Sequence, residues 1–144
     1  MPLNIGVPLE KDFTLDRTDA FYGASADSPT RITIVQATQG AHEKRAQLFS
    51  NVIREMGNTG DDIVRLIQRF SMEELKRIEC SLTLKACNIK MENGEFLFKF
   101  DNRGKISDSE FKKAWDLLPP YVAQEIHECV LDVNVDWNPS GEVS

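Results

Sequence analysis

The hydrophobic period of the chain changes at Thr38, and this change restricts the fold more than any other feature of the sequence. In residues 30–37 (TRITIVQA), Ile32 and Ile34 alternate with the side chains between them, which is typical of a strand. From Thr38 onward, apolar residues recur at steps of three and four, which predicts a helix that ends before Gly57. A strand that leads into a long amphipathic helix indicates a mixed fold of helices and strands.

Residues 61–86 predict further helical structure, with one ambiguous stretch. Residues 61–70 fit a helical stripe and, in part, an alternating strand, and the helical interpretation is slightly favoured. Ser71 is followed three residues later by Glu74, which is the spacing of a capping box, and an apolar stripe continues from there to Ala86. The pattern therefore predicts that a helix begins near Ser71 and includes Ala86.

The last third of the chain predicts a hairpin followed by two helices. Asn93 and Gly94 lie between two apolar runs within residues 88–100, and both suit the positive backbone angles of a tight turn. Two helices are predicted over residues 108–118 and 121–134. The pair of prolines between them ends the first helix and begins the second, because proline fits the first turn of a helix but not its interior.

Together these elements predict an α+β fold class, with a mainly α-helical body, an N-terminal strand and a short β-hairpin. A chain of 144 residues is long enough for one domain that buries its core without disulfide or metal, and we expect this domain over residues 30–137. Residues 1–29 mix Gly, Pro, Asp and Ser without periodicity, which predicts an extended N-terminal arm. Residues 138–144 predict a polar C-terminal tail.

The formal charge of -6 is distributed unevenly along the chain. Residues 31–90 carry 10 basic and 7 acidic side chains, whereas residues 91–144 carry 5 and 11. Such a chain is a poor ligand for nucleic acid, because phosphate affinity needs a concentrated basic surface. No apolar run reaches the roughly 20 residues of a membrane span, and the N-terminus lacks the pattern of a secretory signal. We therefore expect a cytoplasmic protein that binds neither nucleic acid nor membranes.

The sequence offers no recognisable catalytic or cofactor-binding motif. Neither His42 nor His127 stands in a catalytic motif, and histidines at a helix edge are more often structural or exposed. Glu125, Glu128 and Asp132 have helical spacing but polar neighbours, which predicts ordinary exposed carboxylates. A glycine-rich phosphate loop is also missing from the sequence. We expect a protein without enzymatic activity and without a cofactor.

Three cysteines, Cys80, Cys87 and Cys129, form an odd set that suits a reducing compartment better than a disulfide framework. Cys80 and Cys87 have no His or further Cys nearby to complete a zinc site. Buried structural thiols are therefore the favoured interpretation.

One stretch, FKFDNRGKISDSEF, resembles the second half of a calcium-binding EF-hand. Alignment of Gly104 with the glycine of such a loop puts Lys99 and Arg103 at ligand positions one and five, where calcium requires oxygen atoms. A tight turn followed by the N-terminus of a helix accounts for the same residues. In that interpretation Ser107 and Glu110 form a capping box, in which the Ser107 hydroxyl accepts from the Glu110 amide and the Glu110 carboxylate accepts from the Ser107 amide. We expect no metal site here.

Two longer stretches, SPTRITIVQATQGAHEKRAQLF and EFKKAWDLLPPYVAQEIHECVLDVNVDW, give the chain a resemblance to a known family. Over about residues 28–137, it resembles the small tail assembly chaperones of tailed bacteriophages and prophages. The resemblance implies a non-enzymatic protein of the host cytoplasm that associates with itself. It also implies a partner, the long helical tape-measure protein, which such chaperones shield during tail assembly.

Two other classes of function remain open. One is a structural virion component, either a head-tail connector or a tail-completion subunit, and the other is a small acidic inhibitor of a host factor. Aromatic residues near the termini are candidates for contacts between chains, although packing on the parent domain is favoured. These candidate interaction residues are Phe13, Phe21, Tyr22 and Trp137.

Overall fold

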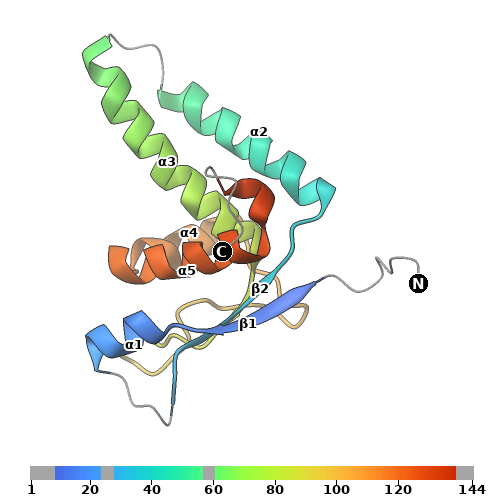
Figure 1. Ribbon diagram of the computed structural model, residues 1–144, viewed down its shortest axis with the longest axis vertical. Coiled ribbons are helices and arrows are strands. Elements are labelled where there is room, and N and C mark those ends of the chain that lie inside the picture. Colours follow the sequence, from blue (N-terminus) through green and yellow to red (C-terminus); the bar gives the residue numbers. More distant parts are fainter. Residues whose placement is uncertain (1–8, 24–27, 57–60, 139–144) are drawn as a thin grey trace.

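The computed structural model describes residues 9–23, 28–56 and 61–138. Within these ranges, an antiparallel sheet with the order β1-β2-β3 consists of β1 (Glu10–Thr14), β2 (Arg31–Val35) and β3 (Leu84–Cys87). The described helices are α1 (Asp16–Tyr22), α2 (Gln39–Met56), α3 (Asp61–Thr83), α4 (Asp108–Asp116), α5 (Pro120–Val133) and the short 3-10 helix η1 (Val135–Trp137). The α+β fold class is thereby confirmed (Figure 1).

The core lies between the sheet and α5, which runs across one face of it (Figure 1). Ile32 and Ile34 of β2 are both buried on this face, as the alternation of residues 30–37 predicts. α5 covers them with the apolar stripe predicted for this helix. Its buried apolar members are Val122, Ile126, Val130 and Val133. α2 and α3 pack against each other as an antiparallel pair that extends away from the sheet (Figure 1).

The N-terminal segment contains regular structure that the sequence pattern does not predict. Residues 10–22 form β1 and α1 and are part of the domain, so the prediction of an extended arm over residues 1–29 is wrong for them. β1 pairs with β2 in the register Phe13 to Ile32, and Leu15 is fully buried. Its amide donates to the carbonyl of Thr30 at 2.9 Å. Backbone pairing with β2 decides the conformation here, although the charged residues of β1 have little strand propensity.

Both ends of α3 differ from the prediction. α3 is continuous through residue 71, so the helix does not begin at Ser71, and residues 61–70 are helical. Ala86, predicted to be helical, pairs with Thr33 of β2. α3 ends at Thr83, whose hydroxyl donates to the carbonyl of Glu79 at 2.8 Å. The open edge of β2 therefore takes residues that would otherwise extend the helix.

A hairpin occupies the position that the sequence predicts, but it is shorter than expected. A single β-bridge joins Lys90 to Phe96, and the Met91 amide donates to the carbonyl of Glu95 at 2.7 Å. Gly94 has a φ of 86°, which is the positive angle expected for this turn, whereas Asn93 does not have the positive φ for which it was suited. None of the described helices combines the length and the apolar character that a membrane span requires.

Candidate functional site

The most distinctive exposed surface of the described chain is an aromatic cluster formed by Phe21, Tyr22 and Tyr121. Phe21 stacks on Tyr121, with ring centroids 4.9 Å apart, and meets Tyr22 edge to face at 5.0 Å. The three residues are 66%, 51% and 44% exposed. Leu117, which precedes α5, is exposed as well. Rings that stack on each other in solvent, rather than on the core, suit contact with another molecule.

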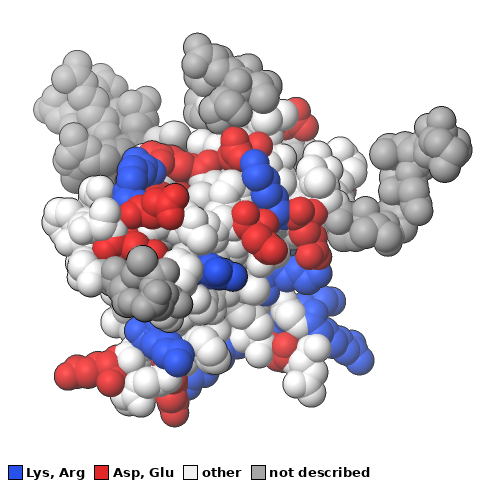
Figure 2. Space-filling view, turned by 60° about the horizontal axis from the view of Figure 1, so that its bottom comes forward, with Lys and Arg blue, Asp and Glu red and all other residues white. Residues whose placement is uncertain are grey.

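A groove of about 650 Å³ lies beside this cluster, between α1, the start of α5 and the hairpin. We call it the α1–α5 groove. Leu118 and Val122 contribute buried apolar side chains to its lining, and Tyr22 and Phe96 contribute exposed rings. Figure 2, a space-filling view of one face of the molecule, shows acidic and basic side chains interspersed, with uncharged surface between them. Asp19 and Lys90 are the charged residues of the groove lining, so apolar contact dominates what the groove can offer to a ligand.

A second hollow, the β3 groove, borders the first. It measures about 610 Å³ and lies between β3 and the hairpin segment that carries Phe96, Phe98 and Phe100. Phe96 lines both grooves, so the two share one side chain, and we call the two neighbouring grooves together the path. In the described sheet β3 is an edge strand.

The carboxylate of Glu125 holds α1 against α5. It accepts hydrogen bonds from the backbone amides of Arg17 at 3.2 Å and Thr18 at 2.8 Å, which are donors of the first helical turn. The Arg17 guanidinium also forms an ion pair with Glu128. The prediction of an exposed carboxylate is therefore wrong for Glu125, which α1 buries. This attachment fixes the position from which α1 presents Phe21.

Most polar side chains around the α1–α5 groove are already engaged within the protein. The Asp19 carboxylate accepts from the amide of Thr30 at 2.9 Å and from its hydroxyl at 2.6 Å. The Asn88 side chain accepts from the Arg31 amide at 2.7 Å. Thr18 differs, because its buried hydroxyl is the one buried side-chain polar atom in the described residues without a hydrogen-bond partner. The groove wall thus contains one unsatisfied polar atom.

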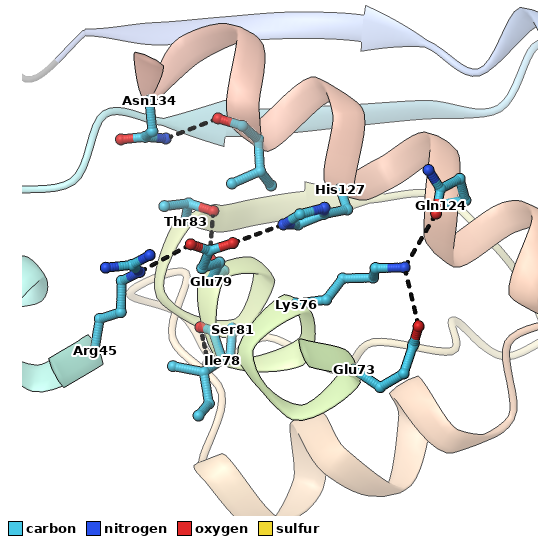
Figure 3. A network of polar contacts seen from close by, with 11 residues as sticks. Arg45, Glu73, Lys76, Ile78, Glu79, Ser81, Thr83, Gln124, His127 and Asn134 are labelled. Atoms are coloured by element: carbon cyan, nitrogen blue, oxygen red, sulfur yellow. Dashed lines mark hydrogen bonds and ion pairs between the residues drawn. The ribbon is translucent and has the colours of Figure 1, made fainter. Parts of the chain in front are cut away.

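A polar cluster lies at the junction of α2, α3 and α5 (Figure 3). At its centre is Glu79, whose side chain is only 3% exposed. Its carboxylate accepts from Arg45 Nε at 2.8 Å and lies 2.7 Å from His127 Nε2. Arg45 also stacks over the Trp137 ring, and Trp137 Nε1 donates to His42 Nδ1 at 3.0 Å. Both oxygens of the buried carboxylate are engaged, so the cluster is a satisfied network that joins three helices.

The cysteines lie in surroundings that disfavour nucleophilic chemistry. Burial raises the pKa of Cys80 well above its ordinary value and raises the pKa of Cys87 and of Cys129 to about 11. All three are free thiols. The thiolate is the reactive form of cysteine, and the raised pKa values keep each of these thiols almost fully protonated near neutral pH.

The EF-hand-like stretch is a turn that leads into α4. Asp101 accepts hydrogen bonds from the amides of Lys105 at 2.9 Å and Arg103 at 2.8 Å, and these donors lower the pKa of its carboxyl group. The Ser107 hydroxyl accepts from the Glu110 amide at 3.2 Å, which confirms the first half of the predicted capping box. No group of three metal-ligating side chains occurs in the described part of the chain.

The structure separates the four predicted interaction residues. Phe21 and Tyr22 lie together in the aromatic cluster, whereas Phe13, a residue of β1, packs against the core. Trp137 is 4% exposed and belongs to the core, so it cannot reach a partner without unfolding of this region. Tyr121 was not predicted. Its position directly after two prolines, at the exposed start of a helix, is the sequence signal that could have identified it.

Comparison of the chain with protein-family models, with curated proteins and with solved structures finds no match in any of the three sets.

Proposed function

We propose that the chain is a non-enzymatic binding protein that holds an apolar helical segment of a partner protein in the α1–α5 groove. The carrying observation is the stacked and exposed pair of Phe21 and Tyr121 beside this groove. The resemblance of the sequence to tail assembly chaperones supplies the partner in this proposal, the tape-measure protein. Self-association is part of the same proposal.

Physical reasoning supports this use of the surface. Single exposed apolar residues are common and carry little meaning. Here the exposed aromatic cluster adjoins a groove that has buried Leu118 and Val122 in its lining. A helix that inserts apolar residues at positions i, i+3 and i+7 would cover this surface, which is the usual mode of recognition in an apolar groove. A long apolar client would also be kept from aggregating.

Co-expression with a long helical protein of the tape-measure class tests the proposal. The double variant Phe21→Ser/Tyr121→Ser removes the two stacked rings, and we expect it to reduce recovery of the soluble client by about 10-fold or more, as loss of aromatic anchors does at interfaces. Ile53→Ser is the matched control, because Ile53 is similarly exposed at 45% but lies on α2. The client should stay soluble with this control.

Two results would contradict the proposal. One is equal recovery of the client with the double variant and the wild-type chain. The other is an insoluble client beside a wild-type chain that elutes alone in size-exclusion chromatography. Co-purification with head or tail structural proteins in place of the client would favour the virion-component alternative.

A further inference from the structure

Charged side chains along the path formed by the two grooves follow a pattern that the proposed function does not require. The residues that line the path include three lysines, Lys85, Lys90 and Lys99, and two acids, Asp19 and Glu95. The chain as a whole has a net charge of -6. The lining is therefore more basic than the protein that contains it.

The two acids are already engaged by neighbouring groups. Asp19 accepts both hydrogen bonds from Thr30, and Glu95 pairs with Lys99 at 2.9 Å. Lys85 pairs with Glu10 of β1. Among the described residues, Lys90 has no carboxylate partner, and its ammonium lies 5.5 Å from the centroid of the Phe96 ring. Lys90 is thus the lysine of this lining that is available to a partner, and it lies beside Phe96, the residue that the two grooves share.

We infer that the path selects an amphipathic helix whose apolar stripe is flanked by acidic residues, with Lys90 pairing with one carboxylate of the partner. This inference rests on the proposed function and specifies the chemistry of its partner. Apolar side chains would cover Phe96 and Tyr22, and the flanking carboxylate would replace water at the Lys90 ammonium. Partial removal of solvent by the helix strengthens such a pair relative to one in open water.

Synthetic helical peptides of about 18 residues, or five turns, provide the test. Three peptides share one leucine stripe and carry Glu, Gln or Lys beside it, and fluorescence anisotropy measures the Kd of each for the full chain. We expect the Glu peptide to bind about five-fold more tightly than the Gln peptide, the upper range for an exposed ion pair, and the Lys peptide to bind most weakly. Raising the salt concentration should narrow these differences.

The variant Lys90→Gln assigns the effect to a residue. It should remove the preference for the Glu peptide and leave the Kd of the Gln peptide within about two-fold, because only the ion pair is lost. Lys44→Gln, on α2 with a half-exposed side chain, is the control and should keep the preference. Equal binding of the Glu and Gln peptides, or a preference that survives Lys90→Gln, would overturn the inference while leaving the groove itself as a binding site. Failure of all three peptides to bind would count against the groove and the inference together.

Discussion

The polar cluster and the α1–α5 groove are both built on α5, but they differ in whether their side chains find partners within the protein. In the polar cluster, the buried carboxylate of Glu79 meets two partners from other helices, Arg45 and His127. Beside the groove, the rings of Phe21, Tyr22 and Tyr121 contact one another but remain open to solvent. A region whose groups are all matched internally contributes to stability, whereas a region with unmatched apolar surface is available to a partner.

This contrast predicts a separation of phenotypes. Substitutions in the polar cluster should lower the free energy of unfolding without a direct effect on the groove. Substitutions of exposed groove residues should change binding and leave stability nearly unchanged. Glu125 is an exception, because it is buried on α5 and caps α1, which carries Phe21, so its loss should affect both properties.

The largest effect on stability is expected for Glu79→Gln. Glutamine removes the negative charge that faces Arg45 and replaces one carboxylate oxygen with an NH2 group, for which His127 Nε2 can be a partner only as an acceptor. We expect the free energy of unfolding to fall by about 3 kcal/mol, as for other broken buried ion networks. Urea denaturation followed by circular dichroism measures this value. Glu73→Gln is the control on the same helix, where the side chain is 66% exposed and the expected change is below about 0.5 kcal/mol. Equal effects of the two substitutions would show that the polar cluster does not hold the helices together.

A smaller but broader effect is expected for Glu125→Gln. The neutral amide oxygen accepts more weakly from the Arg17 and Thr18 amides, and its NH2 group cannot accept at all. We expect a loss of about 2 kcal/mol in the free energy of unfolding, within the range for hydrogen bonds to a buried charged group. Because α1 carries Phe21, client binding should weaken as well. The comparison is with Glu128→Gln, because the Glu128 side chain is 44% exposed and pairs with the Arg17 guanidinium, not with the backbone amides of α1. Unchanged binding by Glu125→Gln would show that α1 keeps its position without this cap.

The sequence predicts the elements whose hydrophobic periods are long and regular. The helix over residues 39–56, the strand at Ile32 and Ile34, and the stripe of α5 are all found where expected. β1 and β3 are missed because four- and five-residue strands of charged and small residues leave no periodic signal. Their conformation depends on pairing with β2, which is a tertiary interaction.

The residues of the aromatic cluster and the polar cluster are likewise only partly predictable from the sequence. Phe21 and Tyr22 could be selected because aromatic residues in a polar segment are costly to leave in water. Glu79 could not, because its helix carries several glutamates and only the distant Arg45 and His127 distinguish the buried one. Periodicity along one helix reports which face is apolar, but it does not report which charges on the other elements will meet it.

The comparison of the two regions is tested most finely by Thr18→Val. The Thr18 hydroxyl is buried in the groove wall without a hydrogen-bond partner, and valine has nearly the same shape. Removal of an unsatisfied buried hydroxyl should raise the free energy of unfolding by about 1 kcal/mol, the lower part of the range for an unpaired polar group. Thr83→Val is the matched control at the other end of the comparison, because its hydroxyl donates to the carbonyl of Glu79 at 2.8 Å. That variant should lose about 1 kcal/mol, the typical net value of a hydrogen bond. Opposite signs for two chemically identical substitutions would establish that the polar cluster is internally satisfied and the groove is not, whereas equal signs would remove the distinction between them.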